Sequence, residues 1–172
     1  MRTYGNDIWI IPFILFGLCS CWVKSGERSD AKQVSEITLS QIKLTDLSGH
    51  PIDLDQYRGK TIFINFWATW CRPCIEEMPS IERAQSMLKG RNIEFLFASN
   101  EEIDRIQNFG LKRNLKLNFM RLENQEELNI QALPTTFIFN PEGKFVFNEM
   151  GFRQWDDPEN IEMITKIINS HE

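Results

Sequence analysis

Histidine is scarce in this sequence, and positive charge is nowhere concentrated. The 172 residues contain only two histidines, His50 and His171. Lysine and arginine total 19 against 24 acidic residues, and they form no basic cluster. A net charge of -5 without a basic patch argues against nucleic-acid binding. Internal repeats and low-complexity tracts are also lacking, and the length suits one folded domain with a short additional segment.

The sequence also lacks an apolar run long enough to span a bilayer. The run at residues 8–18 has eleven residues, which suits the central region of a signal peptide. It ends in Leu-Cys-Ser-Cys at 18–21, which resembles a bacterial lipobox with Cys21 as the site of lipid attachment. A short uncleaved membrane anchor is the alternative, and both interpretations place the rest of the chain outside the cytoplasm.

This pattern divides the chain into three parts. We predict a signal peptide with lipobox, or a short anchor, over residues 1–21. A polar linker follows over residues 22–36. The folded domain covers residues 37–172, and a body of about 130–150 residues needs no disulfide staples to form a core. The predicted location is therefore a bacterial cell envelope, with the domain facing the periplasm and tethered to the membrane.

Cysteine is also sparse, with four in the whole chain. If the chain is cut before Cys21, Cys19 leaves and Cys21 carries lipid. Only Cys71 and Cys74 then remain as thiols, and each is the natural partner of the other. An exported protein with a single close-spaced pair is more typical of a redox enzyme than of a disulfide-stapled scaffold.

Apolar periodicity in the remaining sequence predicts strands that alternate with helices. The predicted strands cover residues 42–44, 51–54, 61–67, 93–98, 118–122, 135–139 and 144–150. The predicted helices cover 74–88, 101–114 (which Gly110 shortens), a short 125–131, and the segment that begins at 157. This order predicts an α/β thioredoxin-like fold with a central mixed sheet, helices on both faces and an N-terminal β-hairpin extension.

The densest chemical signal is Trp70-Cys71-Arg72-Pro73-Cys74, between the strand at 61–67 and the helix that follows. This context places Cys71 at a helix N-terminus. Unpaired backbone N–H groups there favour the thiolate, which is the reactive form of cysteine. Arg72 adds a nearby positive charge. An inert buried cysteine is the structural alternative.

These residues, with others along the chain, resemble the TlpA/ResA-like branch of the thioredoxin superfamily from about residue 42 to the C-terminus. The matching motifs are FWATWCRPC at 66–74, Glu77, Pro79, Leu-Pro-Thr at 133–135 and Asn-x-x-Gly-Lys at 140–144. The resemblance implies an exported, membrane-tethered thiol–disulfide oxidoreductase that serves cytochrome c maturation or general disulfide reduction. It implies protein disulfides as substrates, an upstream membrane thiol donor, a monomeric enzyme and no cofactor.

The cysteine pair has distinct expected roles. Cys71 is the expected nucleophile, and Cys74, one helical turn deeper, attacks the resulting mixed disulfide and releases the substrate. Trp70 is expected to shape the substrate surface, while Arg72 and Pro73 tune the pair. Pro73 before the second cysteine is also found in reducing thioredoxins, which favours a reductase.

A zinc site is the rival interpretation of Cys71 and Cys74, but it requires two more ligands. The chain offers only His50, in a predicted turn, and His171, at the extreme C-terminus. We therefore predict no metal site.

By resemblance, Pro134 corresponds to the cis-proline that faces the active-site disulfide in this superfamily. A cis bond would leave the backbone of Leu133 free to pair with an extended substrate segment. An ordinary proline at the first residue of a strand is the alternative. We expect Leu133 and Pro134 to form the substrate-binding edge.

Glu77 lies three residues after Cys74, on the same side of the predicted helix. In the TlpA/ResA-like branch, which this sequence resembles, a glutamate at this position is buried and tunes the acidity of the thiols. Asn65 departs from cytosolic thioredoxins, which have a buried aspartate six residues before the first cysteine. We therefore expect Glu77, rather than position 65, to accept the proton of a thiol.

Two other functions compete with disulfide exchange. A peroxiredoxin-like antioxidant enzyme shares this fold, but it needs a threonine or serine three residues before its reactive cysteine, where this chain has Ala68. A redox-inactive binding lipoprotein is the second alternative, and the intact cysteine pair argues against it.

Overall fold

The computed structural model describes Met1 and residues 37–170. The predicted signal peptide or anchor, its lipidation site Cys21 and the linker lie outside the described residues, apart from Met1. Within the described part, no helix is both long and apolar enough to cross a bilayer.

The described chain forms one seven-stranded sheet with three α-helices and three 3-10 helices. The strands are β1 (Leu44–Thr45), β2 (Pro51–Ile52), β3 (Thr61–Phe66), β4 (Ile93–Ser99), β5 (Phe119–Leu122), β6 (Thr135–Phe139) and β7 (Phe145–Met150). The helices are α1 (Arg72–Met87), α2 (Ile103–Arg113) and α3 (Pro158–Ile168), with 3-10 helices η1 (Leu39–Gln41), η2 (Leu54–Tyr57) and η3 (Gln125–Leu128).

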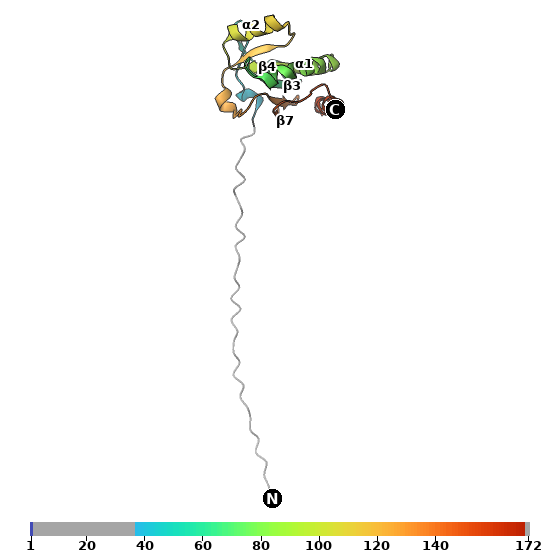
Figure 1. The fold of residues 1–172 in the computed structure, drawn as a ribbon. Coiled ribbons are helices and arrows are strands. Elements are labelled where there is room, and N and C mark those ends of the chain that lie inside the picture. Colours follow the sequence, from blue (N-terminus) through green and yellow to red (C-terminus); the bar gives the residue numbers. More distant parts are fainter. Residues whose placement is uncertain (2–36, 171–172) are drawn as a thin grey trace. The chain divides into compact units, whose positions relative to one another are not determined.

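The sheet order is β2-β1-β5-β4-β3-β6-β7. Strand β4 pairs in parallel with β3 on one side and with β5 on the other, and all other neighbouring strands are antiparallel. This confirms the thioredoxin-like mixed sheet and the hairpin β1–β2 that precedes it. Figure 1 shows α1 next to β3 and β4 in the middle of the domain.

The two faces of the sheet are covered by different kinds of helix. Buried side chains of α1, α2 and α3, among them Met78, Ile106 and Ile164, belong to one hydrophobic cluster. The other cluster takes its covering side chains from the 3-10 helices, including Leu39, Leu54 and Leu128. Helical segments thus lie on both faces, as predicted, but the α-helices share one of them.

Gly110 does not shorten α2, contrary to the prediction. The helix continues to Arg113 and ends at Asn114, whose φ of 50° is left-handed. A Cβ atom added at Gly110 would lie 3.2 Å from a ring carbon of Phe119 on β5. The missing side chain therefore lets α2 approach the sheet closely, and for this reason a glycine occupies the helix interior.

Strand β3 positions the cysteine motif. All six of its residues are buried, as expected for a central strand with both faces covered. Its last residue, Phe66, pairs with Thr135, the first residue of β6. The segment that leads to Cys71 and the segment that contains Pro134 therefore lie at the same end of the sheet.

Candidate active site

Cys71 and Cys74 form a disulfide bond at the N-terminus of α1. Cys71 is the N-cap residue, and its Sγ atom accepts a hydrogen bond of 3.2 Å from the backbone N–H of Cys74. Pro73 lies in the first turn, where its lack of an N–H removes no hydrogen bond of the helix. The sulfur of Cys71 therefore lies at the start of α1, beside the unpaired backbone N–H groups of its first turn, as the sequence predicts.

The surface around the disulfide is uneven in exposure. Trp70 is 70% exposed, whereas Cys71 is 4% exposed and Cys74 is fully buried. Arg72 forms an exposed ion pair with Glu76, with 2.8 Å between Nε and Oε1. Its charge is therefore hydrated and already paired, so Arg72 contributes less to the field at the sulfur than an isolated cation would.

The Leu133–Pro134 peptide bond is cis. The carbonyl of Pro134 accepts a 2.8 Å hydrogen bond from the N–H of Gly151, while the Thr135 hydroxyl donates to the Ala132 carbonyl at 2.7 Å. These bonds hold the turn that precedes β6. Leu133 is half-buried next to it.

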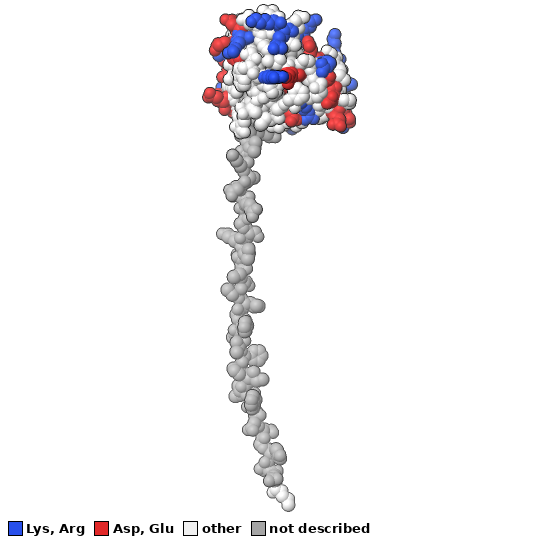
Figure 2. Space-filling view, viewed as in Figure 1, with Lys and Arg blue, Asp and Glu red and all other residues white. Residues whose placement is uncertain are grey.

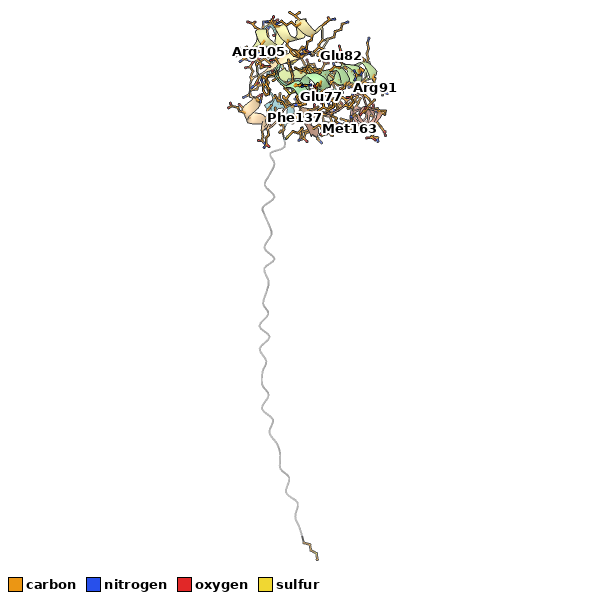
Figure 3. All side chains as sticks on the ribbon, viewed as in Figure 1. Glu77, Glu82, Arg91, Arg105, Phe137 and Met163 are labelled. Atoms are coloured by element: carbon orange, nitrogen blue, oxygen red, sulfur yellow. A yellow bond between two sulfur atoms is a disulfide. The ribbon has the colours of Figure 1, made fainter. Side chains whose placement is uncertain are left out.

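Glu77 is fully buried in α1. Its Oε1 atom accepts hydrogen bonds from the Trp155 indole N–H and from the Arg153 backbone N–H, the latter at 3.2 Å. Its Oε2 atom accepts one from the side-chain amide of Asn65 at 3.4 Å. Figure 3 shows Glu77 near the middle of the domain, with Glu82 of the same helix further out.

Burial raises the pKa of the Glu77 carboxyl to about 7, because the charged form loses its hydration. The hydrogen bonds from Trp155, Arg153 and Asn65 oppose this shift, and the negative charge of Glu149 adds to it. At neutral pH, both protonation states of Glu77 are therefore populated. A carboxyl group in this balance can accept and return a proton.

Asn65 and Glu77 meet in the structure, although they come from different elements. The Asn65 amide also donates a 3.0 Å hydrogen bond to the Thr136 hydroxyl, which fixes its orientation toward Glu77. The titratable group expected at this place in a thioredoxin is thus present, but it comes from the helix rather than from the strand.

A second carboxylate, which the sequence did not predict, lies close to the site. Glu101, just after β4, accepts hydrogen bonds from the backbone N–H of Thr69 at 2.6 Å and from the Thr69 hydroxyl at 2.7 Å. Arg105 forms an ion pair with it at 3.2 Å. Glu101 therefore fixes the segment immediately before Cys71. An acidic residue at the carboxyl end of a strand parallel to β3 was the available signal.

Trp155 and Arg153 were also missed. They lie in the loop between β7 and α3, 78 and 76 positions from Glu77 along the chain, so only the fold reveals their contact. An isolated tryptophan in a polar connecting segment is the single hint that the sequence contains.

Metal ligands do not gather within residues 37–170, where no group of three or more His, Cys, Asp or Glu could hold a metal ion. His50 lies in the β1–β2 turn against Asp46, at 3.3 Å. His171 lies outside the described residues. Figure 2 shows basic and acidic side chains distributed around the visible face, with a largely uncharged area between them.

Comparison with known proteins shows the family. Residues 36–147 match the model of the AhpC/TSA family, and the chain belongs to this family. The chain is 34% identical over 112 residues to the thiol-disulfide oxidoreductase ResA of Geobacillus kaustophilus, covering 62% of this chain and 64% of that protein. It is 34% identical over 108 residues to ResA of Bacillus subtilis, covering 60% of each. The matched region thus spans less than two thirds of these relatives.

Solved structures agree on the fold. One is a Chlorobium tepidum protein assigned as the thiol:disulfide interchange protein DsbE, with a TM-score of 0.65 and 19% identity over 74% of this chain and 92% of that one. Another is MTB DsbF, with a TM-score of 0.57 and 19% identity over 76% of this chain and 94% of that one. At these identities the likeness shows the thioredoxin-like fold alone.

Proposed function

We propose that this member of the AhpC/TSA family is an exported, membrane-tethered thiol–disulfide oxidoreductase. Its active pair is Cys71 and Cys74, and its substrates are protein disulfides. The observation that carries the proposal is the Cys71–Cys74 disulfide at the N-terminus of α1, with a buried carboxyl group on the same helix. The similarity to proteins named thiol-disulfide oxidoreductase ResA supports it.

The reaction exchanges one disulfide for another. In the reduced enzyme, the Cys71 thiolate attacks a substrate disulfide, forms a mixed disulfide and expels one substrate sulfur as a thiolate. Cys74 then loses its proton to Glu77 and attacks the Cys71 sulfur, which expels the second substrate sulfur. Glu77 passes this proton to one of the released substrate thiolates, and solvent supplies a proton to the other. The substrate thus gains two electrons and two protons, and the enzyme pair is left as the disulfide seen in the structure.

The site is suited to a macromolecular substrate. The highly exposed Trp70 ring stands next to the nearly buried Cys71, so a partner must lie on this surface to reach the sulfur. The half-buried Leu133 before the cis bond offers its backbone to an extended segment. We propose Trp70, Leu133 and Pro134 as the substrate-binding residues.

The tether and the direction of electron flow complete the proposal. The run at residues 8–18 and the lipobox-like 18–21 support lipidation at Cys21, with residues 22–36 as the linker to a monomeric domain. Pro73 supports a reductase that draws electrons from a membrane thiol donor. Known pairs of this type have reduction potentials from about -270 to -120 mV, and we expect a value at the reducing end.

An insulin-reduction assay on the full chain tests the proposal. Cys19→Ser and Cys21→Ser give a background in which Cys71 and Cys74 are the only thiols. We expect this background to catalyse reduction of insulin, Cys71→Ser to abolish it, and Cys74→Ser to accumulate a mixed disulfide. Full activity of Cys71→Ser would overturn the mechanism.

Two further measurements separate the competing functions. Rapid consumption of peroxide, without disulfide exchange, would indicate a peroxiredoxin-like enzyme. A thiol titration without a reversible Cys71–Cys74 disulfide would indicate a binding lipoprotein. The measured potential of the pair decides between a reductase and an oxidase.

A further inference from the structure

The loop between β7 and α3 is bound to one side of α1 by hydrogen bonds and an ion pair. The backbone N–H of Trp155 donates to the Ser80 hydroxyl at 3.1 Å, and that hydroxyl donates to the Glu77 carbonyl at 2.8 Å. Arg83 pairs with Asp156 at 2.5 Å. Positions 77, 80 and 83 lie one turn apart on one side of the helix. The loop is therefore held in register with the buried carboxyl group.

The indole ring of Trp155 has little freedom in this position. It is fully buried, and it packs edge-on against the Phe63 ring, with 4.7 Å between centroids and an interplanar angle of 83°. Phe147 contacts it from β7, with a centroid distance of 6.2 Å. Because the ring is fixed, its N–H points at Oε1 of Glu77. The Arg153 N–H donates to the same oxygen.

We propose that Trp155 is a positioning residue for the Glu77 carboxyl group, whose indole N–H orients the carboxylate and stabilises its charged form. This inference rests on the proposed function to the extent that Glu77 acts there as proton acceptor. Trp155 does not touch the reacting sulfur atoms in this role. It acts through Glu77.

Burial of Glu77 disfavours its charged form, and hydrogen bonds to the carboxylate favour it, so the loss of the Trp155 donor should change its pKa. Its side chain has no cation paired with it among the described residues, so only N–H donors compensate the charge. A hydrogen bond to a buried charge is stronger than one between neutral groups, and its loss leaves the charged form less favoured. Without the indole N–H, Glu77 should stay protonated to a higher pH and accept a thiol proton less readily at neutral pH.

Few other charged groups face Glu77 in the described structure. Glu149 on β7 raises the pKa of Glu77, and the Arg153 guanidinium pairs with Glu149. On α1 itself, Cys74 lies one turn earlier, and Glu76 is paired with Arg72 on the exposed side. The other polar groups of this network are uncharged: Asn65 on β3 donates to Glu77, Thr136 on β6 accepts from Asn65, and Asn160 on α3 accepts from Arg153. The Arg153 guanidinium also lies over the Trp155 ring, 5.5 Å from its centroid, and Trp155→Phe keeps an aromatic ring beneath it.

Trp155→Phe removes the N–H and keeps an aromatic ring, and Trp67→Phe is its matched control. Both tryptophans are buried in the same cluster, but the Trp67 indole N–H has no partner in the described structure. The readout is the pH titration of the Glu77 side-chain carboxyl by carbon NMR in the full chain. We expect a midpoint near 7 in the parent, raised by about one pH unit in Trp155→Phe and unchanged in Trp67→Phe. Equal midpoints in all three proteins would overturn the inference.

The parent protein provides a second readout, which stands even if Trp155→Phe does not fold. The indole N–H resonance of Trp155 should move with pH at the same midpoint as Glu77, while the Trp67 resonance stays still. A stationary Trp155 resonance would overturn the inference. If the parent catalyses no disulfide exchange, the proposed function fails, but the two titrations still decide the positioning role. If exchange occurs, its pH profile should shift upward in Trp155→Phe only.

Discussion

Two carboxylates lie close to the cysteine pair, a fully buried one at Glu77 and a partly buried one at Glu101, and their charges are compensated in different ways. Glu101 pairs with the Arg105 cation and accepts both donors of Thr69. Glu77 is enclosed in the core and accepts N–H groups from Asn65 and the β7–α3 loop, with no cation paired to it in the described chain. Glu101 fixes the backbone that leads to Cys71, whereas Glu77 is a buried carboxyl group whose pKa is raised to about 7.

In the proposed mechanism, this difference separates a carboxylate that holds the backbone from one that transfers a proton. An ion pair together with hydroxyl and backbone donors fixes the position of the Glu101 carboxylate, which suits a group that holds a loop in place. Burial opposed by neutral donors leaves the two forms of Glu77 close in free energy, with a pKa of about 7. The following variants test this contrast.

The largest expected effect is a pH dependence of stability that originates at Glu77. Its pKa is raised from 4.5 to about 7 on folding, so the folded state binds the proton more tightly. The stabilisation is fully present below pH 4.5 and is lost as the pH rises to about 7, after which the loss is constant. The shift corresponds to about 3 kcal/mol. Denaturant unfolding across this pH range should show the decline.

Glu77→Gln isolates this contribution, because glutamine keeps the size of the side chain and cannot titrate. The decline between pH 4.5 and 7 should be absent from the variant, and the difference between the two curves removes the effects of all other groups. Disulfide exchange at pH 7 should also slow. A variant curve that parallels the parent curve would show that Glu77 titrates normally.

The next effect concerns the hydrogen bonds by which Glu101 holds Thr69. Glu101→Ala leaves the N–H and the hydroxyl of Thr69 without their acceptor, which should lower the free energy of unfolding by about 2 kcal/mol. Exchange should slow at every pH, because the segment before Cys71 loses its anchor. The neighbouring Glu102→Ala is the control, since Glu102 is 81% exposed. If exchange by Glu101→Ala slowed only in the pH range where Glu77→Gln slows it, the contrast between a carboxylate that holds the backbone and one that transfers a proton would be wrong.

The sequence predicted the parts of this site that depend on short spacing. The strand that leads to Cys71 follows from a nearly continuous apolar run and the helix after it from apolar spacings of three and four residues, and the structure has both. The role expected of Glu77 came from the resemblance to a known family rather than from spacing. The sequence could not predict which residues donate hydrogen bonds to Glu77, or that Glu101 accepts those of Thr69. These contacts depend on how β7, α3 and β4 pack. Gly110 illustrates the same limit: its role is visible only when Phe119 lies against it.

A smaller effect should follow from restoring the aspartate that thioredoxins have on the strand. In Asn65→Asp, a second carboxyl replaces the amide that lies 3.4 Å from Glu77, so the two groups titrate as a coupled pair. Repulsion should raise the upper midpoint by about one pH unit or more. Carbon NMR titration measures it. In Asn65→Asp with Glu77→Gln only one carboxyl remains, and the upper midpoint should disappear; its persistence would assign it to another group.

The smallest effect is expected at Glu76, and it tests whether burial is what distinguishes Glu77. Glu76 precedes Glu77 on α1, but its side chain is 54% exposed and pairs with Arg72 in water. Exposed ion pairs contribute little to stability. Glu76→Gln should therefore leave both the pH dependence of unfolding and the exchange rate unchanged within error. If it slowed exchange more than Glu77→Gln, the proton would pass through a hydrated surface carboxylate, and the buried group with its indole partner would serve the fold alone.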